Sequence, residues 1–188
     1  MANDSFQLNA IGGVELSSVA KGMEAADAML KTANVKLILA RSVCPGKYIV
    51  MAAGDVGDVT AAVEAGSAKA AHALVDSFVI PNIHPEVFPA IEGTTVVDNL
   101  ESLGIIEAFS VSALIEAADA AVKAAPVKLM EIRLAMALGG KAFVTLTGSV
   151  GAAETAVAAG AAVVAKKGLL VEKVVIPQPR QELLREMI

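Results

Sequence analysis

The sequence predicts an α/β protein of the α+β type, built from two tandem copies of one β-α-β-β-α-β unit. The first observation behind this prediction is an internal repeat that spans most of the 188 residues. The second is that strand-like and helix-like apolar patterns follow one another in the same order in both copies. The third is composition, because 55% of the residues are apolar and 19% charged, which is enough to form a sizeable core.

The repeat is found in three consecutive blocks. Residues 15–37 align with 107–129 at an offset of 92, with 13 of 23 positions identical. Residues 46–66 align with 140–160 at an offset of 94, with 10 of 21 identical, and 79–81 match 175–177 at an offset of 96. The step from 92 to 94 means that the second copy has two extra residues between the first two blocks, as is typical of a loop.

The first half of each copy predicts a strand, a helix and a second strand. In copy one, residues 10–16 form a short apolar strand, and Ser17 or Ser18 caps a helix that runs to about Ala33. We expect one face of this helix to carry the apolar stripe Val19, Met23, Ala26 and Leu30. Residues 35–40 follow as the second strand.

The second half predicts a third strand, a second helix and a fourth strand. After a Pro/Gly turn, residues 48–53 form the third strand. Asp55 is expected to cap a helix whose buried stripe is Val56, Val59 and Val63, and residues 74–80 form the last strand before Pro81. This order is that of a ferredoxin-like unit, and we expect a small mixed sheet with the helices on one face.

These patterns divide the chain into five segments: an N-terminal extension (1–9), a first domain (10–84), a linker with Pro85 and Pro89 (85–101), a second domain (102–180) and a short helical tail (181–188).

Composition excludes several functions. A net charge of −5 without a basic cluster, no Trp and one Tyr argue against a nucleic-acid partner. No apolar run approaches the roughly 18–20 residues that span a bilayer, and the first residues do not resemble a signal peptide. A single Cys cannot form a disulfide within the chain. We therefore expect a soluble cytoplasmic protein, and its mean hydropathy of +0.63 favours burial against other chains.

The repeated motifs resemble the shell domain of bacterial microcompartments. In copy one they read EAADAMLKTANVKL, GDVGDVTAAVEAG and VIPN, and in copy two EAADAAVKAAPVKL, GSVGAAETAVAAG and VIPQP. The resemblance covers nearly the whole chain except the first nine residues and part of the linker. It implies two such domains per chain, a homotrimer that imitates a hexamer, and packing against neighbouring shell proteins. It also implies that the protein is not an enzyme.

In this family the turn after the second strand lines a pore at the centre of the trimer. The corresponding residues here are Ser42, Val43, Cys44, Pro45, Gly46 and Lys47 in copy one, and Leu138, Gly139, Gly140 and Lys141 in copy two. Cys-Pro-Gly departs from the usual Gly/Ser-rich loop. It is similar to the loop of tandem-domain shell proteins of propanediol-utilisation compartments, where a Cys in this place holds an iron–sulfur cluster.

Taken by itself, Cys44 is a lone thiol, and lone cysteines are usually small buried hydrophobic residues. Its place before Pro45-Gly46 indicates a turn instead, and Arg41 and Lys47 supply positive charge near a thiolate. The resemblance implies one [4Fe–4S] cluster per trimer, with three Cys44 ligands and one iron left open. Its redox partner would be an enzyme inside the compartment or an electron carrier in the cytosol.

Two other functions stay open. One is a shell protein with an open metabolite pore and no cofactor. The other is a sensor or regulatory protein of ferredoxin-like build, because that topology serves many functions.

Other residues carry weaker signals. Lys31 and Lys123 end the first helix of each copy, where a cation stabilises the helix dipole, and the resemblance implies that they lie on the edge of the trimer. Neither His72 nor His84 has a second ligand at metal-binding spacing. We interpret Asp27 and Asp119, which occupy the same place in both copies, as structural.

Overall fold

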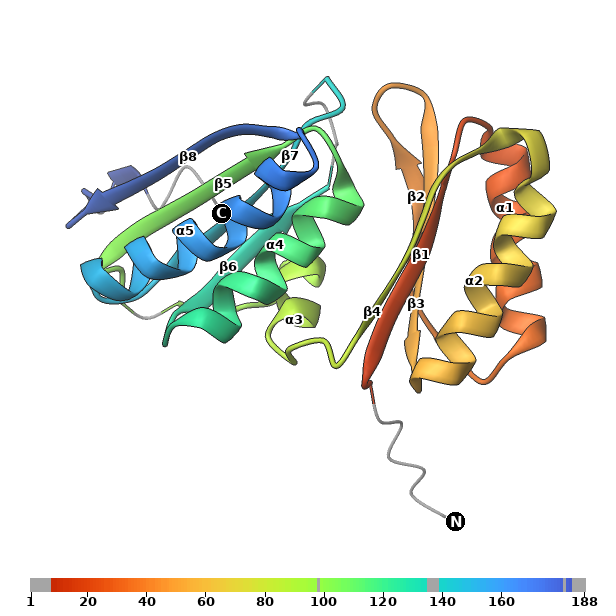
Figure 1. Ribbon diagram of the computed structural model, residues 1–188, viewed down its shortest axis with the longest axis horizontal. Coiled ribbons are helices and arrows are strands. Elements are labelled where there is room, and N and C mark those ends of the chain that lie inside the picture. Colours follow the sequence, from red (N-terminus) through yellow and green to blue (C-terminus); the bar gives the residue numbers. More distant parts are fainter. Residues whose placement is uncertain (1–7, 98, 135–138, 181, 184–188) are drawn as a thin grey trace, which may run out of the picture. The chain divides into compact units, whose positions relative to one another are not determined.

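The computed structural model describes residues 8–97, 99–134, 139–180 and 182–183. The chain forms two compact units, residues 1–83 and 84–188, and each consists of a sheet with two helices on one face (Figure 1).

The first unit has the predicted order of elements. Its strands are β1 (Ala10–Leu16), β2 (Lys36–Val43), β3 (Lys47–Gly54) and β4 (Leu74–Pro81). Its helices are α1 (Val19–Thr32), α2 (Val56–Ala70) and the short 3-10 turn η1 (Ala71–Ala73).

The second unit repeats this order. It begins with helix α3 (Val87–Glu92), which lies in the segment expected to be a linker. There follow β5 (Ser102–Ala108), α4 (Val111–Ala124), β6 (Lys128–Arg133), β7 (Ala142–Thr147), α5 (Val150–Lys166) and β8 (Leu170–Pro177). Most of the predicted helical tail, 181 and 184–188, lies outside the described residues.

The sheet order confirms the ferredoxin-like unit. The strands lie in the order β2-β3-β1-β4 in the first unit and β6-β7-β5-β8 in the second. The expectation of a mixed sheet is wrong, since every strand pair is antiparallel. The two strands joined by a helix, β1 and β2, are separated by β3, so the parallel strands never become neighbours.

Helix α1 packs through a face other than the predicted one. Its buried residues are Gly22, Ala25, Ala26 and Met29, whereas Val19, Met23 and Leu30 are 41%, 59% and 43% exposed. Small side chains let the helix approach the sheet closely, and the larger apolar residues are left on the outside. This outer surface has no cover within the described residues of the first unit.

The predicted helix caps are only partly correct. Ser18 caps α1 by accepting a hydrogen bond from the Lys21 backbone N–H at 3.3 Å. Asp55 precedes α2 but makes no capping hydrogen bond, because its Oδ1 accepts a bond from Asn9 Nδ2 at 3.1 Å. Val59 and Val63 are buried as expected, while Val56 in the first turn is 40% exposed.

Each pair of helices meets at a glycine. A Cβ on Gly66 in α2 would lie 2.8 Å from Met29 Cγ of α1, and one on Gly160 in α5 would lie 2.6 Å from the Ala117 carbonyl oxygen of α4. The two glycines are equivalent in the repeat, so both copies use the same close helix–helix approach.

Candidate functional site

The candidate pore loop of the first unit is the tip of the β2–β3 hairpin. The strand ladder ends at the pair Val43–Lys47, so Cys44, Pro45 and Gly46 form a three-residue turn. The Cys44–Pro45 peptide bond is cis, and Gly46 has a φ of +71°. A residue in the left-handed region at the end of a three-residue hairpin loop is most easily a glycine.

The Cys44 side chain is half-buried at this tip and carries a free thiol. It is therefore not the buried core residue that a lone Cys most often is. Within the described part of the chain, no group of three or more His, Cys, Asp or Glu side chains could hold a metal ion. One chain thus offers a single soft ligand at this place.

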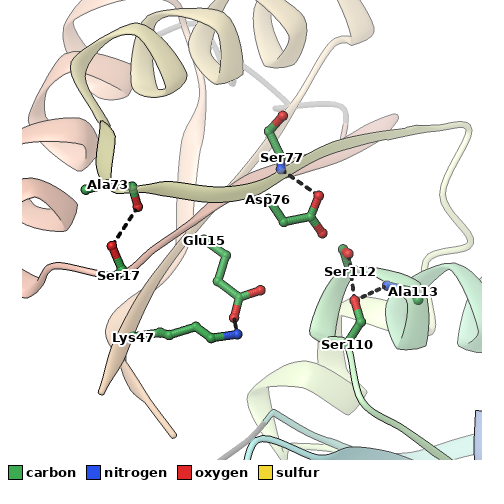
Figure 2. A network of polar contacts seen from close by, with 9 residues as sticks. All are labelled: Glu15, Ser17, Lys47, Ala73, Asp76, Ser77, Ser110, Ser112 and Ala113. Atoms are coloured by element: carbon green, nitrogen blue, oxygen red, sulfur yellow. Dashed lines mark hydrogen bonds and ion pairs between the residues drawn. The ribbon is translucent and has the colours of Figure 1, made fainter. Parts of the chain in front are cut away.

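An ion pair braces the base of the hairpin. Lys47 Nζ lies 2.8 Å from Glu15 Oε1 of β1, and the Glu15 side chain is only 11% exposed (Figure 2). The pair is diagonal across β1 and β3, because Glu15 is opposite Ile49. The Lys47 ammonium, which was expected to supply positive charge near a Cys44 thiolate, is therefore paired with the Glu15 carboxylate.

The second unit repeats this brace. Lys141 Nζ lies 2.6 Å from Glu107 Oε1, and these residues are the equivalents of Lys47 and Glu15. Sequence reasoning missed both glutamates, although each recurs at the offset of its copy. Two residues of opposite charge that recur together in a duplication are a usable signal for a conserved contact.

Arg41 and its equivalent Arg133 have different surroundings. Arg133 pairs with Glu131 at 2.7 Å and lies 5.5 Å from the centroid of the Phe143 ring. In copy one these partners are replaced by Leu39 and Ile49. The Arg41 Nε is buried and finds no hydrogen-bond acceptor among the residues that the structure describes. The hairpin that carries Cys44 thus also carries a cation without a carboxylate partner.

The second hairpin is built differently. Among the described residues its ladder ends at Arg133–Phe143, which corresponds to Arg41–Ile49, so the pair that would match Ser42–Tyr48 is not formed. Gly139 and Gly140 both have positive φ, +60° and +88°, as turn residues do. Leu138, the remaining predicted residue of this loop, lies outside the described residues.

Lys31 and Lys123 stand at the other end of each unit. Each is in the last turn of its helix and pairs with the aspartate one turn earlier, Lys31 with Asp27 and Lys123 with Asp119, both at 2.6 Å. The eight residues of β2 separate this end from Cys44, roughly 25 Å at about 3.3 Å per residue. The structure therefore does not bring the predicted edge and pore residues together.

Of the two histidines and the two repeated aspartates, His84 and Asp119 take part in the packing of the second unit, whereas His72 and Asp27 are exposed. His72 is exposed in η1, and the half-buried His84 accepts a hydrogen bond on Nδ1 from the Glu86 backbone N–H at 3.4 Å. Asp119 is 8% exposed and accepts the His84 backbone N–H at 2.8 Å. These contacts belong to the packing of the second unit.

No helix in the described part of the chain is long and apolar enough to cross a membrane.

Comparison with known proteins identifies the repeated unit. The BMC domain family matches residues 10–83 and 102–179, which together are most of the chain. The bacterial microcompartment shell protein PduT of Citrobacter freundii is 48% identical over 179 residues, covering 95% of this chain and 97% of that protein.

Solved structures give the same result. A microcompartment protein from Desulfitobacterium hafniense superposes with a TM-score of 0.91 at 53% identity, covering 94% of this chain and 98% of that one. A fused, permuted hexameric shell protein from the RMM microcompartment shares the fold, with a TM-score of 0.62 at 24% identity over 83% of each chain. The relatives are structural proteins, and the expectation that this chain is not an enzyme is confirmed. The chain belongs to the BMC-domain family as a tandem-domain bacterial microcompartment shell protein of the PduT type.

Proposed function

We propose that three copies of this chain form a pseudohexameric tile of the shell, with Cys44 of each chain at its centre as a ligand of one shared [4Fe–4S] cluster. Two units of one fold per chain supply six similar wedges from three chains, which suits a hexagonal tile. Lys31 and Lys123, at the ends of the units far from the hairpin tips, would then lie on the outer edge beside neighbouring shell proteins.

The contrast between the two hairpins carries the proposal. A [4Fe–4S] cluster is held by cysteine thiolates, usually four. The chain has one Cys, so a shared cluster needs several chains, and a threefold axis through the first hairpins would supply three thiolates. The second hairpin has neither Cys nor an unpartnered Arg. The residues of the first hairpin therefore fit a soft, anionic group.

Three features of the chain suit Cys44 to this role. The turn closed by Gly46 holds the thiol at the tip of the hairpin, where it is half-buried rather than enclosed in the core. The Glu15–Lys47 ion pair fixes the base of the turn. Arg41, three residues before Cys44 on the same hairpin, has a buried Nε–H without an acceptor among the described residues, and its positive charge would favour an anionic group on this hairpin. When bound, such a cluster supplies one-electron redox chemistry at the pore.

The test compares anaerobically purified wild-type protein with Cys44→Ser. We expect the wild type to be brown, to contain iron and sulfide, and to sediment at three times the 19.1 kDa chain mass. Cys44→Ser should lose colour and iron while remaining trimeric, because the thiol lies at a tip and not in the core. Ser42→Ala, a change in the same loop that removes no ligand, is the matched control and should keep both.

The outcomes separate the two parts of the proposal. Colourless, iron-free wild-type protein prepared without oxygen would remove the cluster and favour a tile with an open metabolite pore. A wild type that is monomeric at every concentration would remove the tile itself.

A further inference from the structure

The segment after β4 docks on the second unit through two hydrogen bonds. The backbone N–H of His84 donates to Asp119 Oδ1 of α4 at 2.8 Å. The Glu86 Oε2 accepts the backbone N–H of Leu129, on the edge strand β6, at 3.1 Å. Between them they attach residues 84–92, here named the first exit segment, to one helix and one strand edge.

Apolar contacts complete this docking. Val87, Phe88, Ala90 and Ile91 of α3 are all buried, at 8% exposure or less. Under them Leu129 is fully buried, and the side chain of Asp119 is 11% exposed. Both residues that the first exit segment covers thus have almost no contact with water.

The first unit carries the same docking surface without a cover. Asp27 and Leu37 are the equivalents of Asp119 and Leu129. Leu37 lies directly before the irregularity in the edge strand β2, as Leu129 does in β6, so its N–H has the same place on the sheet edge. The Asp27 side chain is nevertheless 62% exposed and Leu37 is 40% exposed.

The carboxylates of Asp27 and Asp119 make the same contact within their helices. Each aspartate binds the lysine one turn later, at 2.6 Å, through Oδ2. In Asp119 the other oxygen accepts the His84 N–H. No bond to Oδ1 of Asp27 is found from the residues that the structure describes, so this oxygen is available to a donor.

A matching segment follows β8. Residues 178–188, the second exit segment, repeat 82–92 at the offset of 96 that joins β4 to β8. Arg180 then corresponds to His84, Glu182 to Glu86 and Leu183 to Val87. In sequence, Leu184 and Met187 take the places of Phe88 and Ile91, so together with Leu183 three of the four buried positions of α3 remain apolar, while Glu186 replaces Ala90.

The residue directly after each of the two strands has the same backbone conformation. Asn82 and Gln178, each directly after the closing proline, both adopt the left-handed conformation, with φ of +52° and +46°. The backbone N–H of Ile83 bonds to the Asn9 carbonyl, and that of Gln178 to the Glu101 carbonyl, so each exit is tied to the residue before the first strand of its unit. Leu183 is 41% exposed, as an unburied anchor would be.

The structure assigns the exposed surface of α1 and β2 a partner: the second exit segment of a neighbouring copy of this chain. The Arg180 N–H donates to Asp27 Oδ1, Glu182 accepts the Leu37 N–H, and Leu183 covers the Leu37 side chain. The contact is head-to-tail, and repeated contacts of that kind form a ring when the rotation closes. The inference rests on the proposed trimeric tile, in which the ring closes after three chains.

Two variants test the contact from its two sides. Glu182→Ala/Leu183→Asp removes the segment's anchors and leaves the surface of α1 and β2 intact. Asp27→Ala/Leu37→Asp removes that surface and leaves the segment intact. We expect each variant alone to sediment as a monomer, and an equimolar mixture to form a 1:1 dimer, because one intact segment meets one intact surface.

The controls are Glu64→Ala on α2 and Glu154→Ala on α5, two exposed glutamates outside the contact, which should stay trimeric. Circular dichroism would verify that each variant is folded. Should a double variant fail to fold, Glu182→Gln alone, which removes only the charge of one acceptor, is expected to weaken association at least about tenfold.

The results distinguish this contact from the tile. Trimers of wild-type stability in both double variants and in Glu182→Gln would overturn the docking and leave the tile proposal standing. A monomeric wild type would overturn the tile before any variant is made. Monomeric variants that form a dimer on mixing would support the head-to-tail contact.

Discussion

At one contact between the first helix and the third strand, the two units fill the same volume with a large side chain from a different element. In the first unit Gly22 of α1 faces Tyr48 of β3 so closely that a Cβ on the glycine would lie 2.2 Å from the ring. The equivalent residues in the second unit are Leu114 and Ala142, both fully buried. The large side chain comes from the sheet in one copy and from the helix in the other. Volume at this contact is therefore conserved, although neither residue is.

The contrast extends to the surface. The backbone order, the Glu–Lys brace of each hairpin and the Asp–Lys pair of each first helix occur in both copies. What differs is the tip of the hairpin and the cover over the edge strand. After duplication the strand order and these two kinds of ion pair were retained, whereas the hairpin tip and the cover over the edge strand changed.

The largest expected effect comes from replacing Gly22 and Tyr48 by the leucine and alanine that occupy these positions in the second unit. Gly22→Leu in the first unit forces a side chain into the Tyr48 ring and should destabilise the protein by about 3 kcal/mol or more. Tyr48→Ala leaves a cavity and should cost about 3–5 kcal/mol. The double variant reproduces the pair of the second unit, and its loss of stability should be smaller than the sum of the two by about 2–3 kcal/mol.

Urea unfolding of the four proteins measures this coupling. Additive losses would mean that the two positions do not share one volume. Tyr48→Phe, which keeps the ring, is the control for the loss of the hydroxyl alone.

A smaller effect separates the two helix-packing glycines. A Cβ at Gly160 meets a backbone oxygen that cannot move without shifting α4, so Gly160→Ala should cost roughly 2–3 kcal/mol. A Cβ at Gly66 meets Cγ and Sδ of the Met29 side chain, which can change rotamer more easily than a backbone can move, and alanine gains about 0.5–1 kcal/mol in a helix interior. Gly66→Ala should therefore change stability by less than about 1 kcal/mol. Equal losses in thermal or urea unfolding would contradict this difference.

The smallest effect concerns a single carboxyl group. The hydrogen bond and charge of Lys21 hold the pKa of Glu24 below its usual range, with a lesser contribution from Lys69. Position 113, the equivalent of Lys21, is already Ala, and Glu116 pairs with Lys167 instead. Lys21→Ala should raise the pKa of Glu24 towards its ordinary value.

The pH dependence follows from the direction of this shift. Because the folded-state pKa is lowered, the contribution of Glu24 to stability is present above the pKa of the unfolded chain. It is lost as the pH falls through the folded-state value. An NMR titration of the Glu24 carboxyl would measure the shift, with Glu116 as the internal control. An unchanged Glu24 titration would show that Lys69 alone sets its pKa.

Much of this fold could be predicted because the sequence pattern of each element occurs twice, once in each copy of the repeat. All four strands of each unit, the positions of its two long helices and a serine cap at Ser17 or Ser18 follow from local patterns, whereas helix α3 was not predicted. The face of α1 did not, because a helix that packs through Gly and Ala has its larger apolar residues on the outside. The missing Asp55 cap likewise depends on Asn9, 46 residues away.

The candidate site was predicted only in part for a similar reason. The turn at Cys44 is local and readable from Pro45-Gly46. The Glu15–Lys47 ion pair joins residues 32 positions apart. Arg41 differs from Arg133 because the residues that contact Arg133 are replaced in copy one. Neither is visible in a single stretch of sequence, although both emerge when the two copies are compared.

The docking of the first exit segment inside the chain also affects how a shell would grow. In the proposed ring of three chains, each chain would complete one of the six exit-segment contacts as it folds, so three would be in place before any encounter between chains. Closing the ring then depends on the third power of the chain concentration, whereas six separate units would require the sixth power. For the proposed tile, fusion of two units in one chain would lower the protein concentration that assembly requires and would replace a steep concentration threshold by a shallow one.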